Sequence, residues 1–239
     1  MPDPTHAVLL DMDGVLVDVH GSFRRAVRET VAHFTGAEPS HATIQALKDG
    51  GGYNNDWVLS HRLAQDGGSD ASFEAIRAHF QTLYLGERHA EGVFDGLIAT
   101  EPPAVRTETL EALAARYPLA LVTGRPEADA AWTLRRFAWD RLVPVAIGMG
   151  AQGERGKPDP YGLHLALDAL GVPAERALFA GDTVDDVAAA RAAGAVAVGV
   201  IPPGADAQAH GATLRAAGAA HVLASADELP ALAAELWGR

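Results

Sequence analysis

The segment Val8-Leu9-Leu10-Asp11-Met12-Asp13-Gly14-Val15 decides how the rest of the sequence is interpreted. Its apolar residues predict a buried strand that ends in a sharp turn at Gly14. Asp11 and Asp13 therefore stand where the strand becomes a loop, which is the edge where open α/β sheets bind their ligands. Two carboxylates this close together suit a hard cation such as Mg²⁺, or a division of labour between a nucleophile and a proton carrier.

Three other interpretations of this segment stay open when it is read alone. Asp and Gly are common in hairpin turns, although a hairpin leaves the paired carboxylates unexplained. A helix–loop–helix calcium loop requires an acid or Asn at its fifth position and Glu at its twelfth, where this chain has Val15 and Ser22. The third is chance, because a single D-x-D-G pattern is only moderately specific.

The composition is that of a globular enzyme. With 239 residues, 48% hydrophobic and 21% charged, the chain can form one domain with an insertion, or two domains. The net charge of −12 argues against a nucleic-acid partner, and it requires that any phosphate ligand be held by local cations. The absence of cysteine excludes disulfides, thiolate catalysis and thiolate zinc sites.

No targeting or membrane segment is evident. The chain passes from Met1-Pro2-Asp3 into a short apolar strand, without a basic leader or an apolar run long enough to span a bilayer. We therefore expect a cytoplasmic protein with no membrane partner. The sequence does not indicate an oligomeric state.

The order of the predicted elements indicates an α/β fold. Residues 19–88 show helical spacing and no convincing strand. Apolar runs then alternate with helical segments; the expected strands are 119–122, 143–147, 177–180, 196–200 and 221–223. This alternation predicts a Rossmann-like core with a parallel sheet, residues 1–18 and 89–239, and an inserted all-helical domain, residues 19–88.

Polar residues follow the ends of several predicted strands. Thr123 follows the second strand, Lys157 lies in the loop after the third, and Asp182, Asp185 and Asp186 follow the fourth. Each has an ordinary structural explanation, as a helix cap, a solvated lysine or acids in a first helical turn. Because the ends of parallel strands share one edge of the sheet, all of them can also converge on Asp11 and form one site.

Taken in order, these residues resemble the motifs of the haloacid dehalogenase superfamily of hydrolases, most of which are phosphatases. The motifs are Asp11-Met12-Asp13-Gly14, Thr123 after an apolar run, Gly156-Lys157-Pro158, and Gly181-Asp182-Thr183-Val184-Asp185-Asp186. The helical insert between the first two resembles the small C1-type cap of subfamily I, as in phosphoglycolate phosphatase-like members. Its Gly-Gly-Tyr-Asn-Asn-Asp-Trp run is similar to that of a small clade of subfamily IA.

The resemblance implies a Mg²⁺-dependent phosphatase that hydrolyses a small phosphomonoester through an aspartyl-phosphate. In that family Asp11 would be the nucleophile, and Asp13 would protonate the leaving oxygen and then activate water. The carboxylates of Asp11 and Asp182 and the main-chain carbonyl of Asp13 would hold the metal.

The resemblance also assigns residues to the phosphate and to the surroundings of the metal. Thr123, the Gly124 N–H group and Lys157 would bind the phosphoryl oxygens. Arg125 is a further candidate, although an arginine at a helix start can equally point to solvent. Asp185 or Asp186 would orient metal-bound water or Lys157, and the sequence does not separate the two.

Other reactions and roles remain as alternatives. Dehalogenases of this superfamily lack the second acid, so Asp13 argues against carbon–halogen cleavage. Phosphonate-cleaving relatives also lack it and use a cap lysine, for which Lys48 is the one candidate in the insert. A phosphomutase uses the same Asp pair on a sugar phosphate. A catalytically silent binding protein would have lost at least one chemical residue, and none is missing.

The run from Gly50 to Trp57 is the candidate specificity loop of the insert. Resemblance implies that Gly52, Asn54 and Asn55 read the part of the substrate that carries no phosphate, since amides can donate and accept hydrogen bonds. The alternative is a flexible inter-helix turn in which Asn55 or Asp56 caps the following helix. The sequence does not identify the substrate itself.

Overall fold

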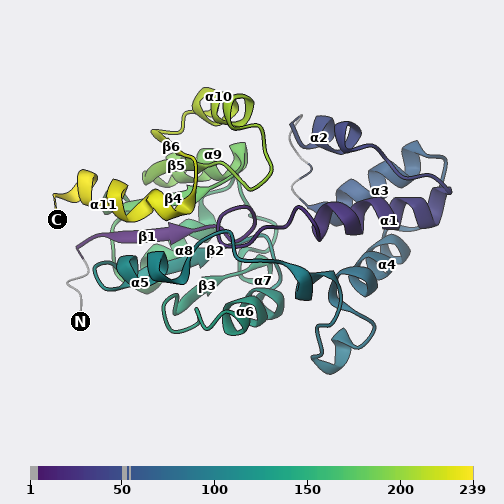
Figure 1. Cartoon of the computed structure of the whole chain (residues 1–239), viewed down its shortest axis with the longest axis horizontal. Coiled ribbons are helices and arrows are strands. Elements are labelled where there is room, and N and C mark those ends of the chain that lie inside the picture. The colour runs from purple at the N-terminus through teal and green to yellow at the C-terminus, as the bar shows by residue number, and fades with distance from the viewer. Residues whose placement is uncertain (1–4, 50–52, 54, 239) are drawn as a thin grey trace. The chain divides into compact units, whose positions relative to one another are not determined.

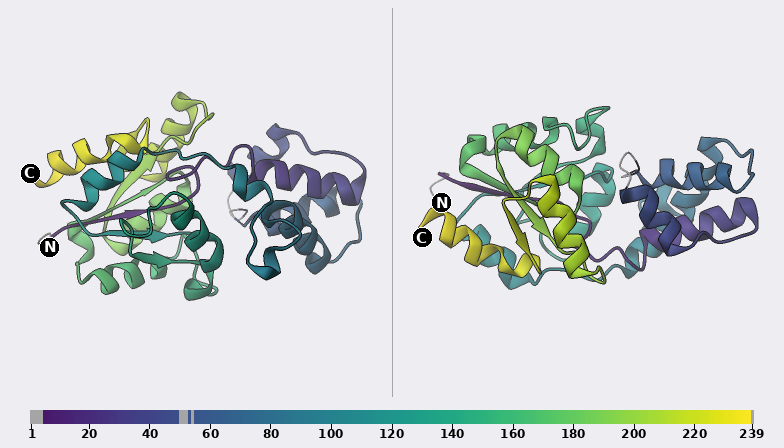
Figure 2. Two further views of the ribbon diagram at one scale, coloured as in Figure 1. Left: turned by 60° about the horizontal axis from the view of Figure 1, so that its bottom comes forward. Right: turned by 90° about the horizontal axis from the view of Figure 1, so that it is seen from above.

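The structure is a computed structural model, and it describes residues 5–49, 53 and 55–238. The chain divides into two compact units, Met1–Asp18 with Pro103–Arg239 and Val19–Pro102. We call the first the core unit and the second the helical unit. Figures 1 and 2 show the strands within the core unit, whereas the described part of the helical unit contains helices and no strand.

A six-stranded sheet organises the core unit. Every paired strand runs parallel, in the order β3-β2-β1-β4-β5-β6. The strands are β1 (Ala7–Leu10), β2 (Leu119–Val122), β3 (Val145–Ile147), β4 (Ala177–Gly181), β5 (Val196–Val200) and β6 (His221–Leu223). The predicted parallel α/β fold is therefore confirmed, with the first strand of the chain at the centre of the sheet.

Helices flank this sheet because its central strands are apolar on both faces. β1, β2 and β4 are buried along their whole length, as expected of a parallel sheet. Alternate residues such as Leu9 and Phe179 join one cluster with Leu163 and Val187, so Val8 and Leu10 face the opposite side. The helices are α5 (Thr107–Ala114), α6 (Glu127–Arg136), α7 (Met149–Gln152), α8 (Tyr161–Leu170), α9 (Val184–Ala193), α10 (Ala207–Ala217) and α11 (Leu229–Trp237).

The strand order places the site. From β1 the sheet continues to β2 on one side and to β4 on the other, so the order of the chain reverses between β1 and β4. Connections on the two sides of such a reversal diverge and leave room for a ligand beyond the carboxyl ends of the strands. Here those ends are Leu10 and Gly181, directly before Asp11 and Asp182.

The described part of the helical unit contains four α-helices, and aromatic side chains of the first and the last of them pack together in it. The helices are α1 (Phe23–Thr35), α2 (His41–Asp49), α3 (Asp56–Asp66) and α4 (Phe73–Leu85). The ring of Phe23 stacks on Tyr84 with 4.3 Å between centroids, and Phe80 lies beside both. The α1, α3 and α4 helices contact one another, which buries their apolar faces.

The boundary at which the chain returns from the helical unit to the core unit differs from the predicted one. The sequence pattern predicts residues 89–102 as part of the core, whereas they belong to the helical unit in the structure. The buried carboxylate of Glu101 accepts hydrogen bonds from Ser22 at 2.5 Å and from Tyr84 at 3.0 Å. These long-range bonds hold the segment to α1 and α4, and sequence periodicity cannot reveal them.

One full helix was not predicted. α10 begins after Asp206, whose side chain accepts from the Ala209 N–H group, and it ends before Gly218 in the left-handed conformation. Both are ordinary helix boundaries, but the residues between them lack a clear apolar stripe. Within the described residues no helix combines the length and apolarity needed to cross a bilayer.

Candidate active site

The loop after β1 is a tight turn built on backbone hydrogen bonds. The Asp11 N–H group donates to Ala180 on β4, and the Met12 carbonyl accepts from two N–H groups four and five residues later. Gly14 has φ +73, and a Cβ there would overlap the Asp182 carboxylate. The glycine of the first motif is therefore required both by its conformation and by the close approach of an acid from another strand.

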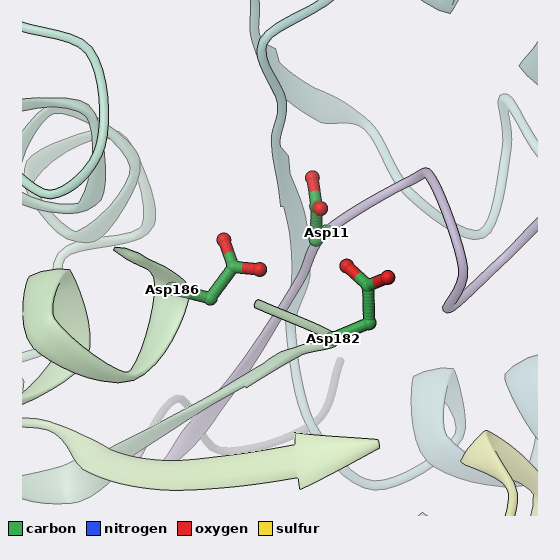
Figure 3. A group of neighbouring side chains, drawn as sticks. All are labelled: Asp11, Asp182 and Asp186. Carbon is green, nitrogen blue, oxygen red and sulfur yellow. The ribbon is translucent and has the colours of Figure 1, made fainter. Parts of the chain in front are cut away.

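Three carboxylates converge beyond the ends of β1 and β4 (Figure 3). Oxygens of Asp11, Asp182 and Asp186 all lie within 4.8 Å of one another. Asp11 follows β1, Asp182 follows β4, and Asp186 stands in the first turn of α9. The structure thus brings together acids that are far apart in the sequence, as the strand-end argument predicted.

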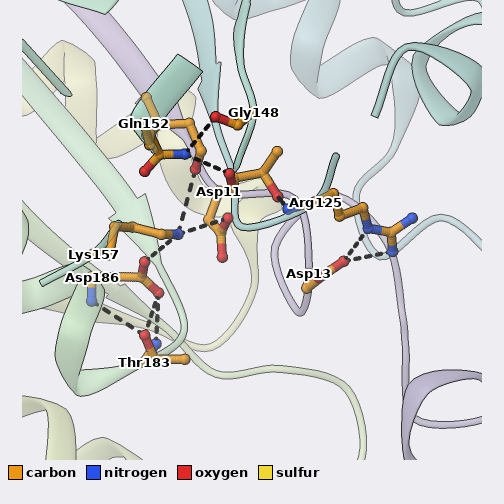
Figure 4. Close-up of polar contacts among 10 residues, drawn as sticks. Asp11, Asp13, Arg125, Gly148, Gln152, Lys157, Thr183 and Asp186 are labelled. Atoms are coloured by element: carbon orange, nitrogen blue, oxygen red, sulfur yellow. Dashed lines mark hydrogen bonds and ion pairs between the residues drawn. The ribbon is translucent and has the colours of Figure 1, made fainter. Parts of the chain in front are cut away.

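Lys157 is the cation between these acids. Its Nζ lies 2.9 Å from Asp11 Oδ1 and 2.6 Å from Asp186 Oδ1 (Figure 4). The same atom donates to the Val122 carbonyl at 3.4 Å, at the end of β2. Because its side chain is only 8% exposed, the ammonium is fixed in place and is not a solvated surface lysine.

The negative charges of the acids around Lys157 outnumber the single positive charge of its ammonium. Burial, together with the charges of Asp186 and Asp13, outweighs the opposing effect of Lys157 and raises the pKa of Asp11 to about 7. Burial and then the charge of Asp186 raise the pKa of Asp182 well above its usual range. Burial lowers the pKa of Lys157, but the charges of Asp11 and Asp186 outweigh it and raise that pKa overall.

This imbalance fits a bound divalent cation. Three carboxylates share a single ammonium, so ionising all of them in a buried site requires further positive charge. The atoms that could bind the cation are carboxylate oxygens, which hard cations such as Mg²⁺ prefer as ligands. The residues present therefore suit the metal that the sequence predicts.

The fourth motif forms a reciprocal helix cap. Asp186 Oδ2 accepts from the N–H and hydroxyl groups of Thr183, and Thr183 Oγ1 accepts from the Asp186 N–H group. A Cβ at Gly181 would overlap the Asp186 side chain, so the carboxylate passes directly over this glycine. Asp186 is thereby held where its Oδ1 contacts Lys157.

Thr123 and Gly124 stand at the end of β2. Thr123 is 1% exposed, and its Oγ1 accepts from the Arg125 N–H group at 3.2 Å. The Thr123 carbonyl accepts from the side-chain amide of Gln152 at 2.7 Å, and Gln152 also donates to Gly148. Gln152 was not predicted, because a buried glutamine on a four-residue helix has no sequence signature.

Arg125 is buried beside Asp13. Its Nε donates to Asp13 Oδ1 at 2.8 Å, and its Nη2 lies 2.5 Å from the same oxygen (Figure 4). The arginine is 2% exposed, so it does not point to solvent, which was one of the two predicted alternatives.

Comparison with known proteins identifies the family. Residues 5–194 match the family model described as haloacid dehalogenase-like hydrolase. This chain belongs to that family. The motifs that suggested the resemblance are those whose side chains meet at the sheet edge.

Individual relatives narrow the class of hydrolase. The chain is 31% identical to a phosphoglycolate phosphatase of Rhodospirillum rubrum over 79% of its length and 76% of that protein. It is 42% identical to a Phytophthora nicotianae protein named imidazoleglycerol-phosphate dehydratase, over 85% of this chain but 45% of that one. The chain thus spans less than half the length of this second relative. The hydrolase is a phosphatase of the haloacid dehalogenase-like family.

Solved structures agree on the fold over nearly the whole chain. A hydrolase of the same family from Deinococcus radiodurans, solved with bound phosphate and sodium, is 29% identical with a TM-score of 0.67 and covers 97% of this chain and 96% of its own. A Thermotoga maritima protein named after β-phosphoglucomutase is 26% identical with a TM-score of 0.68, over 97% of this chain and 100% of its own.

A histidine outside the motifs touches the site of the hydrolase. His210, on the unpredicted helix α10, lies with its Nε2 2.7 Å from the main-chain carbonyl of Asp182. Because a carbonyl only accepts, the imidazole donates through Nε2. His210 therefore fixes the backbone that presents Asp182, and its position after residue 194 places it beyond the family match.

The predicted specificity residues of the helical unit are only partly described. Gly52 and Asn54 lie outside the described residues. Asn55 is the N-cap of α3, where its Oδ1 accepts from the N–H groups of Trp57 at 3.0 Å and Val58 at 3.3 Å. This is the capping role that sequence analysis kept as the alternative for Asn55.

Proposed function

We propose that this hydrolase is a Mg²⁺-dependent phosphatase that cleaves a small phosphomonoester through an aspartyl-phosphate on Asp11. The observation that carries the proposal is the position of Lys157, whose Nζ joins Asp11 and Asp186 while the Asp182 carboxylate lies close by. A nucleophilic carboxylate must be held still and kept ionised next to an anionic substrate. The ammonium supports both requirements.

In the first step, Asp11 attacks phosphorus while the bond from phosphorus to the alcohol oxygen breaks. Asp13 donates a proton to that leaving oxygen. Thr123 and the Gly124 N–H group bind the phosphoryl oxygens, and Lys157 offsets their growing negative charge. These roles support each other because all five residues lie in connections that follow strands at one sheet edge.

In the second step, water attacks phosphorus and the bond from phosphorus to Asp11 breaks. Asp13, now a carboxylate, takes the proton from the attacking water, so inorganic phosphate leaves and both acids return to their starting forms.

Asp11, Asp182 and the main-chain carbonyl of Asp13 would hold Mg²⁺, with Asp186 as a neighbouring acid. When bound, the metal supplies positive charge to the carboxylates and to the phosphoryl group. Lys157 remains the protein's own cation in the site, and His210 steadies the peptide that carries Asp182.

The substrate class rests on the relatives. Their names include phosphoglycolate phosphatase and 5'-nucleotidase, and the 42% identical relative is named after a phosphorylated imidazole compound. We therefore propose a panel of phosphoglycolate, a nucleoside monophosphate, a hexose phosphate and histidinol phosphate. The last is included because it joins an imidazole to a phosphomonoester.

The test is release of inorganic phosphate by purified wild-type protein and by Asp11→Asn. We expect turnover of at least one panel member with Mg²⁺, and a loss of about 10³-fold or more in the variant, because the nucleophile acts as part of a unit. Activity of Asp11→Asn within a few-fold of wild type would overturn the proposal. Transfer of the phosphate to another hydroxyl of the hexose phosphate, without release, would favour a phosphomutase.

A further inference from the structure

The ion pair between the buried Arg125 and the half-buried Asp13 has not been given a role in the chemistry described so far. Arg125 follows β2 and Asp13 follows β1, 112 residues apart in the sequence. The Nε and Nη2 groups of Arg125 lie at 2.8 and 2.5 Å from the same oxygen, Asp13 Oδ1. When two N–H groups of one guanidinium bind the same carboxylate oxygen, they fix the position of that carboxylate.

Arg125 is itself held on several sides. Its Nη1 donates to Thr133 Oγ1 at 3.2 Å, its main-chain N–H group donates to Thr123 Oγ1, and its carbonyl accepts from the Met149 N–H group. The side chain is only 1% exposed. The guanidinium is thus held by α6, and the main chain of Arg125 is held by Thr123 and by the start of α7. The guanidinium therefore has little freedom to leave Asp13.

The two carboxylate oxygens of Asp13 differ in their hydrogen-bond partners. Oδ1 accepts from Arg125, whereas Oδ2 makes no hydrogen bond or ion pair with any described residue. The side chain is 32% exposed, so part of it faces solvent. One oxygen is thus an anchor, and the other is available to give or take a proton.

We propose that Arg125 is a positioning residue for Asp13, which it holds so that Oδ2 can serve the leaving oxygen and then the attacking water. This inference rests on the proposed function, in which Asp13 carries the proton. It differs from the sequence-based prediction that Arg125 binds phosphate. An arginine that binds phosphate presents its fork to the anion, whereas here that fork is occupied by Asp13 and Thr133.

A double-mutant cycle separates the two roles. We would measure kcat and KM of wild type, Arg125→Gln, Asp13→Ala and the double variant, with an alkyl phosphate and with p-nitrophenyl phosphate. For the alkyl phosphate, Arg125→Gln should lower kcat by about 10²-fold with KM nearly unchanged, because a misplaced proton carrier is costly. The loss should be smaller for p-nitrophenyl phosphate, whose leaving group departs without a proton.

The decisive arm is the double variant. If Arg125 acts through Asp13, adding Arg125→Gln to Asp13→Ala should change kcat by less than about 3-fold, because the two effects are then not additive. The inference would be overturned in favour of phosphate binding if Arg125→Gln lowered kcat equally in wild type and in Asp13→Ala, raised KM and weakened inhibition by inorganic phosphate. An unchanged kcat in Arg125→Gln alone would also overturn it.

Two further variants keep the test valid if Arg125→Gln folds poorly. Thr133→Val removes one anchor of the guanidinium but keeps its charge, and it should lower kcat for the alkyl phosphate several-fold at constant KM; no change would count against the inference. Arg135→Gln, on the exposed side of the same helix, is the matched control and should behave as wild type. Asp11→Asn, measured in parallel, reports separately on the proposed function.

Discussion

At the scale of single residues, the site depends on acids that occupy different environments. The side chain of Asp11 is 8% exposed and paired with Lys157, whereas that of Asp13 is 32% exposed and paired with Arg125. A fixed, buried carboxylate suits attack on phosphorus, and a more exposed one suits proton exchange with substrate and water. In the proposed reaction the two neighbouring acids of one loop would therefore have different roles.

Replacement of Asp13 tests this division of labour. Asp13→Ala should lower kcat for an alkyl phosphate by about 10²–10⁴-fold, because it removes the proton carrier. The loss for p-nitrophenyl phosphate should be smaller where formation of the aspartyl-phosphate limits the rate. Steady-state kinetics on both substrates measure this, and equal losses for the two leaving groups would contradict the role of Asp13 in that step.

The sequence predicted which core residues converge better than it predicted the side chains that support them. The strand-end argument placed Asp11, Lys157 and Asp182 at one sheet edge because parallel strands leave few other options. It could not show that Arg125 closes on Asp13, because such a pair depends on rotamers and loop paths. Gln152 and the other supporting side chains carry no signature of their own for the same reason.

At the scale of elements, the start of α3 decides between two roles of Asn55. The side chain already satisfies two N–H groups of the first helical turn. Asn55→Ala should therefore lower the free energy of unfolding by about 1 kcal/mol, the usual cost of losing an N-cap. Asn55→Asp keeps the capping oxygen and removes the amide donor, so it should retain most of that stability.

Thermal or denaturant unfolding measures the capping effect, and kinetics on a native substrate measure any effect on recognition. Unchanged stability in Asn55→Ala, combined with a loss of kcat/KM in both variants that p-nitrophenyl phosphate does not show, would contradict the capping account. It would restore the specificity role that the sequence suggested for this residue.

A second element-scale contact joins the start of α5 to the 3₁₀ turn before α11. Asp227 accepts from the N–H group and Nε of Arg106 and from Thr109 Oγ1 at 2.5 Å. Burial alone would raise the pKa of Asp227, but the hydrogen bonds from Thr109 and Arg106 outweigh it and lower that pKa. The ionised form is thus favoured in the folded core unit.

The sign of this shift sets a pH dependence. A carboxyl group with a lowered folded pKa stabilises the fold above its unfolded pKa of about 3.9 and loses this effect as the pH falls further. Asp227→Asn should therefore cost about 1 kcal/mol at neutral pH, and the difference from wild type should shrink below about pH 4. Urea unfolding of both proteins across this range is the check; a pH-independent difference would exclude the ionic contribution.

At the scale of the whole molecule, the sequence predicted the class of fold but not all of its limits. The six strands appear at or near their predicted positions because each is a short apolar run bounded by turn residues. Residues 89–102 were assigned to the wrong unit, since their place depends on hydrogen bonds from Ser22 and Tyr84 to Glu101. α10 was missed because Leu214 is its one large apolar residue, among alanines, a glycine and polar residues.

The acidic cluster also predicts a link between metal binding and stability. A ligand that binds the folded state alone stabilises it by RT ln(1 + [L]/Kd), or about 2.7 kcal/mol at a hundred times Kd. Mg²⁺ should thus raise the melting temperature of wild type, and EDTA should reverse the rise. Asp182→Ala should lose most of this response; an equal rise in the variant would contradict the assigned ligand set.

The central claim is that Asp11 forms a covalent bond to phosphorus. The most direct measurement is to quench the enzyme during turnover, reduce it with borohydride, and locate the modified residue by mass spectrometry of the peptide containing Asp11 and Asp13. An acyl phosphate on Asp11 is reduced to homoserine, so we expect homoserine at position 11, dependent on substrate and absent from Asp11→Asn. Active turnover with no homoserine at position 11, or with the modification at Asp13, would contradict the account.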